Sequence, residues 1–341
     1  MITRSLGSDG PDVAALGLGL MGMSDFYGPA DEAESRATID AALDAGITFL
    51  DSGDFYGNGH NELLIREALK GRAREEVVLS VKFGVLRDPG GGFIGVDVRP
   101  AAAKNFLAYT LRRLGTDYVD VYRPARISPD VPIEETVGAI AEMVAAGYVR
   151  HAGLSEVGAD TLRRAHAVHP IADLQIEYSL ISRGIEAEIL PACRDLGVGV
   201  TAYGVLSRGL ISGHWSSGRA LAPHDFRSHA PRFSEENLER NLSLVERLRS
   251  VAEAKGATVA QIAIGWGLSR GDDIVPLIGA RRRERLTEAL GALELELTED
   301  DLAQIEGAVP PGSVAGERYD AQQITILDSA RSGAAGARRA R

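Results

Sequence analysis

Short apolar or β-branched runs alternate with longer stretches of helical periodicity along almost the whole chain, and this alternation constrains the fold most. No series of consecutive strand-like runs interrupts it. Parallel neighbours in a sheet need a crossover connection, which a helix between two strands provides. The chain is therefore expected to form a parallel sheet covered by helices. The eight expected strands are residues 13–19, 48–51, 77–82, 119–122, 152–154, 173–177, 199–203 and 274–278.

The segments between these strands carry the signals of helices. In residues 31–45 apolar side chains recur at helical spacing, Asp31 and Glu34 resemble a capping box, and Gly46 suits a left-handed exit from the helix. A further helix is expected to begin near Ser234. The other segments with helical character are residues 99–114, 132–146, 159–169 and 186–196.

Eight strand and helix units close most naturally as a barrel. The competing arrangement is an open, doubly wound sheet, which usually binds a dinucleotide through a Gly-x-Gly-x-x-Gly turn after its first strand. Residues 17–22 match that pattern by letter, but residues 23–29 follow them in place of an immediate helix. We therefore expect an α/β fold, a single-domain (β/α)8 TIM barrel over residues 1–328. A long loop near residues 205–233 and a disordered tail over residues 329–341 complete the expected organisation.

Composition narrows the class of protein. The length of 341 residues suits one barrel, since such barrels run to about 250 residues or more. The formal charge of −11 disfavours nonspecific binding to nucleic acid or to anionic membranes. Cys193 is the only cysteine, so an intrachain disulfide and a cysteine-cluster zinc site are excluded, and an inert buried thiol is expected there. Without an apolar run of about 18 residues, the chain is expected to be soluble and cytoplasmic.

A carboxylate, a phenol and an ammonium follow the ends of two neighbouring strands. Asp51 ends the second expected strand, Tyr56 lies just beyond it, and Lys82 ends the third. In a closed barrel these strand ends form the site. A free phenol has a pKa of about 10, and a nearby ammonium lowers that value. We therefore expect Tyr56 to donate a proton to a carbonyl, with Lys82 lowering its pKa and Asp51 holding Lys82 charged.

These residues and several other blocks resemble the aldo/keto reductase family. The resemblance covers roughly residues 6–309 and includes residues 49–57, 153–155, 175–179, 206–209 and 278–282. It implies an NADPH-dependent oxidoreductase that reduces an aldehyde or ketone to an alcohol by hydride transfer. In that family pattern Tyr56 is the general acid, and a small-molecule carbonyl is the expected partner. No metal is expected.

The resemblance also implies which residues hold the cofactor. Ser155 and Gln175 match positions that bind the nicotinamide carboxamide, and Tyr203 matches the aromatic residue that stacks on its ring. Glu156 stands where the family usually has Asn, and its carboxylate would accept from the carboxamide amine. The remaining implied contacts are Gly204, Leu206, Arg208, Gly209, Gly279, Ala280, Arg281, Arg285 and Glu288, of which Arg281 and Arg285 match the positions for the 2′-phosphate and Glu288 one that contacts the adenine. Guanidiniums at a helix start suit a dianionic phosphate, which favours NADPH over NADH.

The sequence departs from the family after the fourth strand. Ala125 occupies the position of the usual catalytic His, which removes one donor to the developing oxyanion. Arg123 or Arg126 is a candidate to turn inward in its place. The smaller side chain also leaves space for a bulkier carbonyl or for an enone whose double bond is reduced. The segment from Tyr122 to Arg126 resembles the branch that includes pyridoxal reductases.

Readings from other classes have less support. Metal-dependent hydrolysis needs converging ligands, whereas His151, His166 and His169 fall at a strand start or on a helix. A serine nucleophile lacks its Gly-x-Ser-x-Gly elbow. A nicotinamide-binding, redox-sensing regulatory subunit with little catalysis remains the main rival, because the usual His is missing. The sequence leaves the oligomeric state and the physiological substrate open.

Overall fold

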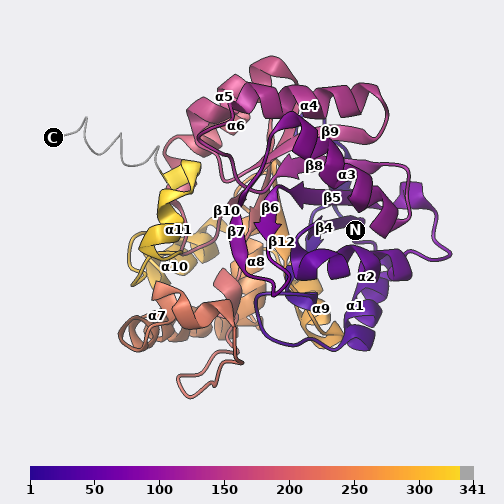
Figure 1. Cartoon of the computed structure of the whole chain (residues 1–341). Helices are drawn as coiled ribbons and strands as arrows, with labels where there is room; N and C mark the ends of the chain where they lie inside the picture. The colour runs from indigo at the N-terminus through magenta and orange to yellow at the C-terminus, as the bar shows by residue number, and fades with distance from the viewer. Residues whose placement is uncertain (331–341) are drawn as a thin grey trace.

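The computed structural model describes residues 1–330, and its centre is a closed barrel of eight parallel strands (Figure 1). Each barrel strand lies beside the one before and the one after it along the chain, and every pairing between neighbours is parallel. The expected (β/α)8 barrel is therefore confirmed. Its strands are β3 (Gly17–Gly19), β4 (Phe49–Gly53), β5 (Val78–Phe83), β8 (Val119–Pro124), β9 (Val149–Ser155), β10 (Ile171–Glu177), β11 (Gly199–Tyr203) and β12 (Ile274–Ile278).

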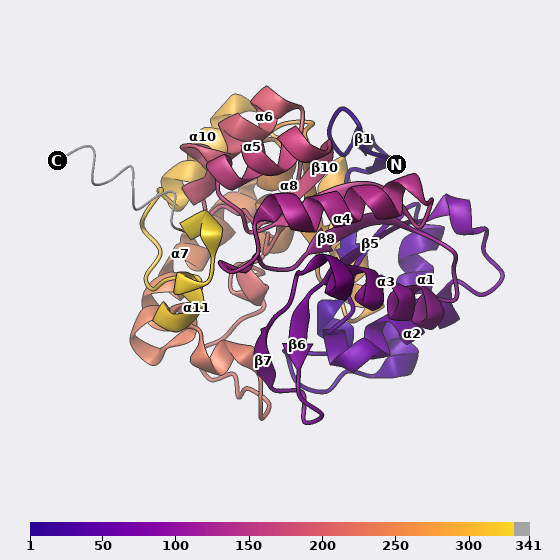
Figure 2. The same ribbon diagram turned by 45° about the horizontal axis from the view of Figure 1, so that its top comes forward.

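Helices cover the outside of the barrel (Figures 1 and 2). Their apolar faces supply the core, as the helical spacing predicts: Ile39 and Ala42 of α1 and Leu107 and Leu114 of α3 are buried. Cys193 is buried in α6, where burial raises the pKa of its thiol to about 12. The helices are α1 (Glu32–Asp44), α2 (His60–Ala68), α3 (Pro100–Leu114), α4 (Ile133–Ala145), α5 (Ala159–Val168), α6 (Ile189–Leu196), α7 (Glu235–Ala254), α8 (Val259–Leu268), α9 (Arg283–Leu290), α10 (Glu299–Ala308) and α11 (Ala321–Thr325).

The first expected strand, residues 13–19, is wrong as a single element. Its first part is β2 (Asp12–Ala14), which pairs antiparallel with β1 (Thr3–Ser5), and only β3 enters the barrel. Gly7, between β1 and β2, has a φ of 74°, and a Cβ there would lie 2.4 Å from the carbonyl oxygen of Ala172. The hairpin therefore packs closely against the barrel, and this tertiary contact splits a continuous apolar run in two.

A second hairpin, β6 (Val85–Arg87) with β7 (Phe93–Val96), was not expected from the sequence. Its turn is held at Asp88, which accepts the backbone N–H of Gly92 at 2.8 Å. Phe93 and Ile94 are 58% and 63% exposed, so they lack the buried face that usually marks a strand. The hairpin lines the same cavity as the C-terminal ends of the barrel strands.

The start of α1 differs from the expected capping box. Asp31 does accept the backbone N–H of Glu34 at 2.9 Å. The Glu34 carboxylate, however, binds the backbone N–H and guanidinium of Arg283 at the start of α9. Only half of the box forms, because a partner from another element is available to Glu34.

The chain after α10 folds back over the barrel instead of leaving it, and we call residues 309–330 the C-terminal strap. Asn241 of α7 holds Ala315 through hydrogen bonds of 2.8 and 2.9 Å. Asp328 accepts the backbone N–H of Gly158 at 2.9 Å. The predicted disordered tail begins at Ser329, whose hydroxyl instead binds Glu156 at 2.5 Å, and residues 331–341 lie outside the described residues.

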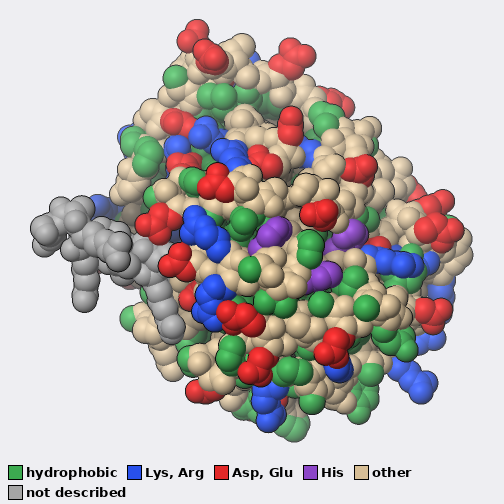
Figure 3. Space-filling model, turned by 90° about the horizontal axis from the view of Figure 1, so that it is seen from above, with side chains coloured by type: hydrophobic (Ala, Val, Ile, Leu, Met, Phe, Trp, Pro, Cys, Tyr) green, Lys and Arg blue, Asp and Glu red, His purple; other side chains and the backbone are tan. Residues whose placement is uncertain are grey.

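The surface carries charges of both signs. Figure 3 shows acidic and basic side chains interspersed over one face, with apolar side chains scattered between them. Within residues 1–330, none of the helices combines the length and apolarity that crossing a membrane requires.

Candidate active site

The C-terminal ends of the barrel strands open into a cavity of about 1760 Å³. All but one of the site residues expected from the sequence line it, although they come from separate strand ends and loops. The exception is Glu156, which is buried and does not line the cavity. The expected residues that line the cavity are Asp51, Tyr56, Lys82, Ser155, Gln175, Tyr203, Gly204, Leu206, Arg208, Gly209, Gly279, Ala280, Arg281, Arg285 and Glu288.

Asp51 and Lys82 form a buried ion pair at the ends of β4 and β5. Their strands are adjacent, which brings two residues 31 positions apart into contact. The other carboxylate oxygen of Asp51 accepts from Ser80 Oγ at 2.9 Å and from Gln175 Nε2 at 2.7 Å. Burial lowers the pKa of Lys82 although the carboxylate of Asp51 acts to raise it. Asp51 is thus a fixed, fully bonded counter-ion for Lys82.

Tyr56 lies beside this pair, with the Lys82 ammonium 5.2 Å from the centre of its ring. Its hydroxyl makes no hydrogen bond to any residue that the structure describes. Burial and the charge of Asp51 raise its pKa well above 10, which contradicts the lowering expected from Lys82. The physical reason is that Asp51 neutralises Lys82, so desolvation of the phenolate dominates. The phenol therefore stays protonated at neutral pH and holds a proton to donate.

Ala125 and its two arginine neighbours have different surroundings. Ala125 is buried against Phe55 and Tyr56. Arg123 is fully buried in the barrel interior, where its Nη2 lies 3.0 Å from Asp173 and 2.8 Å from Ser80 Oγ. Arg126 lines the cavity, and its charge acts to lower the pKa of Tyr56. Of the two arginines that the sequence offered as inward-turning candidates, Arg126 is the one that lines the cavity.

Asp54, in the same motif as Asp51, is buried but does not line the cavity. It is 7% exposed, and neither of its carboxylate oxygens has a side-chain hydrogen-bond partner within residues 1–330. Burial raises its pKa well above the usual value, and the nearby carboxylate of Glu62 adds to the shift.

Asp54→Asn is expected to stabilise the protein by about 1–3 kcal/mol at neutral pH, because it removes a poorly solvated carboxyl. A carboxyl whose folded pKa is raised contributes fully to stability below its unfolded pKa, about 3.9, and that contribution is lost as pH rises through the folded pKa. Urea unfolding at about pH 4 and pH 7 should therefore show the gain only at pH 7. Asp160→Asn, at an exposed position on α5, is the control; an equal gain in both variants would contradict the argument.

Glu156 differs from its expected placement toward the nicotinamide. Its side chain is fully buried, and its two oxygens lie 2.8 Å from the guanidinium nitrogens of Arg318. Tyr203 Oη donates to it at 2.8 Å, and the backbone N–H of Glu177 donates at 3.1 Å. Burial acts to raise the pKa of Glu156, but Arg318 overcomes it and lowers the pKa to about 2. The residue in place of the usual Asn thus anchors the C-terminal strap.

The strap brings Tyr319 to the cavity. Because Tyr203 donates its only hydroxyl hydrogen to ionised Glu156, it accepts from Tyr319 Oη, which lies 2.9 Å away. The guanidinium of Arg208 lies 4.5 Å from the centre of the Tyr319 ring. Arg208 also bonds to Glu177 at 3.3 Å and to the carbonyl of Arg318 at 2.8 Å. Two segments distant in sequence, one with Glu156 and one with Tyr319, therefore hold the hydroxyl of Tyr203.

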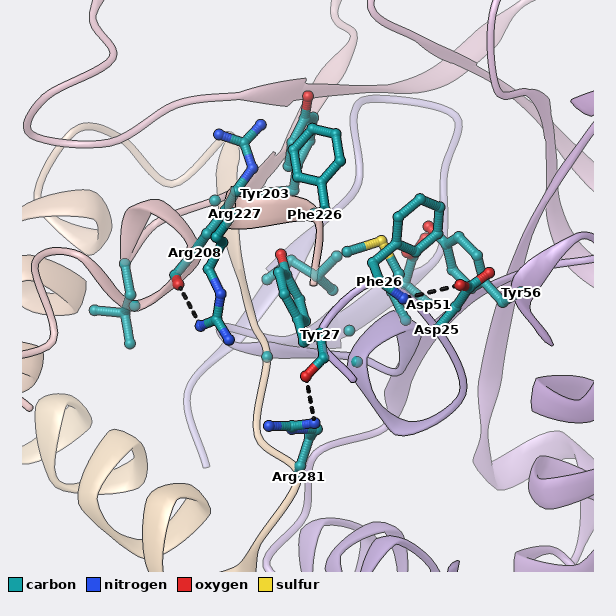
Figure 4. A pocket seen from close by; sticks show the side chains of 18 of the residues that line it. Asp25, Phe26, Tyr27, Asp51, Tyr56, Tyr203, Arg208, Phe226, Arg227 and Arg281 are labelled. Carbon is teal, nitrogen blue, oxygen red and sulfur yellow. Dashed lines mark hydrogen bonds between the residues drawn. The ribbon is translucent and has the colours of Figure 1, made fainter. Parts of the chain in front are cut away.

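The far end of the cavity gathers positive charge (Figure 4). The guanidinium of Arg281 contacts the carbonyl oxygens of Tyr27 and Pro29 at 3.3 and 3.4 Å, and no carboxylate within the described part of the chain pairs with it. Arg285, by contrast, lies 3.0 Å from Glu288 and 2.6 Å from His214. Burial and the charge of Arg227 lower the pKa of Arg281, although the carboxylate of Asp225 acts to raise it.

A bridge crosses the cavity between these two ends. The backbone N–H of Phe226 donates to the carbonyl of Phe26 at 2.8 Å, and the two rings meet edge to face with centroids 6.3 Å apart. Figure 4 shows Tyr27 beside this bridge, between Arg281 and Tyr56. Arg227 is paired with Asp225 at 2.6 Å within the long loop and donates to the carbonyl of Arg208.

Sequence reasoning missed the residues that reach the site from loops. Phe26, Phe226 and Tyr319 lie outside strand ends and outside the quoted family blocks. The sequence predicted a long loop near residues 205–233, but nothing local singled out Phe226 or the strap. Of the residues that the structure describes, no group of three or more His, Cys, Asp or Glu side chains could hold a metal ion.

Comparisons with known proteins bear on this arrangement. Residues 15–310 match the model of the Aldo/keto reductase family. Probable aldo-keto reductase 1 of Glycine max is 41% identical over 315 residues, which cover 92% of this chain and 90% of that protein.

Two solved structures share the fold at lower identity. The glycerol dehydrogenase AKR11B4 from Gluconobacter oxydans superposes with a TM-score of 0.82 at 26% identity, covering 91% of this chain and 96% of that one. The holo form of aldo-keto reductase AKR11C1 from Bacillus halodurans gives a TM-score of 0.75 at 27% identity, covering 94% and 100%. Because the family match spans most of the barrel and the soybean relative aligns over nine-tenths of its own length, the chain belongs to the aldo/keto reductase family of oxidoreductases.

Proposed function

We propose that this aldo/keto reductase uses NADPH to reduce an aldehyde or ketone to an alcohol, with Tyr56 as the general acid. One observation carries the proposal. The Tyr56 hydroxyl lines the cavity, makes no hydrogen bond to residues 1–330, and lies beside the buried Lys82–Asp51 pair. A protonated phenol in that position is available to a carbonyl oxygen that enters the cavity.

The residues at the strand ends have separate roles in this proposal. NADPH, when bound, supplies a hydride to the carbonyl carbon. As negative charge develops on the carbonyl oxygen, Tyr56 Oη donates its proton to that oxygen. Lys82 stabilises the phenolate that remains, and Asp51 keeps Lys82 charged and oriented. Ser80 and Gln175 fix Asp51 through hydrogen bonds of 2.9 and 2.7 Å.

The two ends of the cavity suit the two ends of NADPH. Ser155, Gln175 and Tyr203 would hold the nicotinamide, with the Tyr203 ring fixed by its bond to Glu156. Arg281 would bind the 2′-phosphate, because its partly buried guanidinium has no carboxylate partner among residues 1–330. Arg285 and Glu288 are already bonded to each other, so Arg285 would have to share its charge between that carboxylate and a phosphate.

The first test is NADPH consumption by the purified protein with aldehydes including pyridoxal, ketones and enones. Alcohol formation would support the proposal. A saturated carbonyl product from an enone would identify double-bond reduction, for which the small Ala125 beside Tyr56 leaves room. Tight NADPH binding without turnover on any compound would overturn the proposal in favour of a redox-sensing regulatory subunit.

Arg281→Ala is expected to weaken NADPH binding by about tenfold to a hundredfold, since a charge-assisted hydrogen bond contributes about 1.5–3 kcal/mol. NADH lacks the 2′-phosphate, so its affinity should change by less than about threefold. Arg285→Ala should have a smaller effect, because Arg285 is already paired with Glu288. Dissociation constants from fluorescence titration with both cofactors check these expectations.

Arg283→Ala is the matched control for these variants. Arg283 begins the same helix, but its guanidinium pairs with Glu34 at 2.8 Å and does not line the cavity. Its replacement should leave NADPH affinity unchanged. Equal weakening of NADPH and NADH by Arg281→Ala would rule out a 2′-phosphate site there.

A further inference from the structure

The arginines that line the cavity divide into two groups by their partners. Four are neutralised by a carboxylate of the chain: Arg87 by Asp25, Arg208 by Glu177, Arg227 by Asp225 and Arg285 by Glu288. Four others form no ion pair with any residue from 1 to 330: Arg126, Arg219, Arg281 and Arg282. Arg219, Arg281 and Arg282 belong to the end proposed for the phosphates of NADPH, since the charge of Arg282 acts to lower the pKa of both Arg219 and Arg281.

Arg126 is the unpaired arginine at the Tyr56 end. It follows Ala125, which packs against Tyr56, and its guanidinium donates to the carbonyl oxygen of Ala125 at 2.6 Å. Its other guanidinium N–H groups have no hydrogen-bond partner within the described part of the chain, so at least one edge of the fork is available to the cavity.

The residue before Arg126 belongs to an apolar part of the cavity wall. Phe55 and Ala125 are buried beside Tyr56, and Phe26 and Val85 pack against them. Removing a guanidinium from water without a counter-charge is costly. Burial acts to lower the pKa of Arg126, but nearby groups including Glu156 raise it. Glu156 is paired directly with Arg318, so a ligand anion would give Arg126 the direct ion-pair partner that it lacks among residues 1–330.

The position of the guanidinium points to a group of the substrate other than its reacting oxygen. The neighbours that act most strongly on Arg126 are Tyr319, Tyr203 and Glu156, on the side of the C-terminal strap. The reacting oxygen must instead lie at the hydroxyl of Tyr56. The planar fork of an arginine also matches the two oxygens of a carboxylate or phosphate.

We propose that Arg126 binds an anionic group of the substrate, so that the site takes aldehydes or ketones that carry a carboxylate or phosphate near the carbonyl. This inference rests on the proposed carbonyl reduction. Arg126 then selects the substrate by its charge, which is a different role from that of the imidazole expected at position 125.

The test uses matched pairs of substrates with NADPH and the full-length enzyme. Phenylglyoxylate and its methyl ester differ in a carboxylate, and glyceraldehyde 3-phosphate and glyceraldehyde differ in a phosphate. We expect wild-type kcat/KM to favour the anionic member of at least one pair. A preference in the first pair would identify a carboxylate site, and a preference in the second pair a phosphate site. Arg126→Gln should raise KM for that anionic member by about tenfold to a hundredfold and change kcat/KM for the neutral member by less than about threefold. Arg126→Lys should recover part of the preference.

Two results would overturn the inference. An equal fall in kcat for neutral and anionic members in Arg126→Gln would show that Arg126 acts on the reacting oxygen. A wild-type enzyme without preference for either anionic member would show that no substrate anion is bound. Arg163→Gln, at an exposed position on α5, is the control and should leave all four substrates unchanged.

A binding measurement separates this inference from the proposed function. Mandelate and mandelamide carry a hydroxyl where phenylglyoxylate carries its ketone, and they are titrated calorimetrically against the enzyme saturated with NADPH, which cannot reduce an alcohol. Tighter binding of mandelate that is lost in Arg126→Gln would support a carboxylate site even if no carbonyl were reduced. Equal binding of both compounds to wild type, together with turnover of neutral carbonyls, would overturn the inference and leave the proposed function intact.

Discussion

Tyr56→Phe is expected to lower kcat for carbonyl reduction by about a hundredfold to ten-thousandfold, because general acids contribute about that much to such steps. The ring of Tyr56 packs against Phe55 and Ala125, and phenylalanine keeps these contacts. Its hydroxyl makes no bond to residues 1–330, so its removal leaves no partner unsatisfied in the free enzyme. Single-turnover reduction and NADPH titration should therefore show lost chemistry with cofactor affinity nearly unchanged.

Tyr148→Phe provides the matched control for this experiment. Tyr148 is 52% exposed, and its side chain does not line the cavity, so the same loss of a hydroxyl should leave turnover unchanged. Undiminished turnover in Tyr56→Phe would remove Tyr56 as the proton donor. A large loss of NADPH affinity in that variant would instead indicate that the hydroxyl acts in binding.

Glu156→Gln is expected to destabilise the protein by about 3–5 kcal/mol, the usual cost of removing one partner of a buried ion pair. The change leaves the charge of Arg318 without its carboxylate and weakens the bonds from Tyr203 and Ser329. Because the pKa of Glu156 is lowered to about 2, its contribution is present above the unfolded pKa, about 4.3, and is lost as pH falls toward 2. Urea unfolding monitored by circular dichroism measures the loss.

An exposed ion pair offers the control for this prediction. Glu134 pairs with Arg164 at 2.7 Å on the surface, and Glu134→Gln should destabilise the protein far less than Glu156→Gln, because solvent screens an exposed pair. The double variant Glu156→Gln/Arg318→Gln should be less destabilised than the sum of its single variants, since no unpaired charge remains. An equal loss of unfolding free energy in Glu156→Gln and Glu134→Gln would contradict the argument that the buried Glu156–Arg318 ion pair holds the strap.

Glu156 also links the C-terminal strap to the end of the cavity proposed for the nicotinamide. The hydrogen bonds run from Tyr319 to Tyr203 and from Tyr203 to Glu156. Glu156 therefore couples the C-terminal strap to the aromatic residue proposed to stack on the nicotinamide. A cofactor contact through the Glu156 carboxylate would have to displace a partner that already binds it.

Much of the fold could be predicted because the pattern of the barrel is local. Each strand is a short apolar run and each helix an apolar stripe, and the crossover rule then orders them. The prediction failed at residues 13–19, where a hairpin contact with Gly7 and Ala172 decides which part joins the barrel. It also missed β6 and β7, whose exposed Phe93 and Ile94 carry no alternating pattern.

The candidate site could be predicted as far as strand ends determine it. Asp51, Tyr56 and Lys82 meet because β4 and β5 are neighbours in the barrel, which follows from their order along the chain. The sign of the shift in the pKa of Tyr56 could not be predicted. It depends on how far Asp51 neutralises Lys82 and on how much water is excluded, and both are properties of the packed structure.

The sequence by itself thus determined the alternation of strands and helices, the order of the barrel and the residue types at its strand ends, because these follow from local periodicity and chain connectivity. Only the tertiary structure decided that Arg123 is neutralised by Asp173 inside the barrel while Arg126, three positions further along, lines the cavity without a carboxylate. It likewise decided that Glu156 binds Arg318, 162 positions away in the chain. A charge acts according to its distance from other charges and from water, and that distance is set by folding rather than by spacing in the sequence.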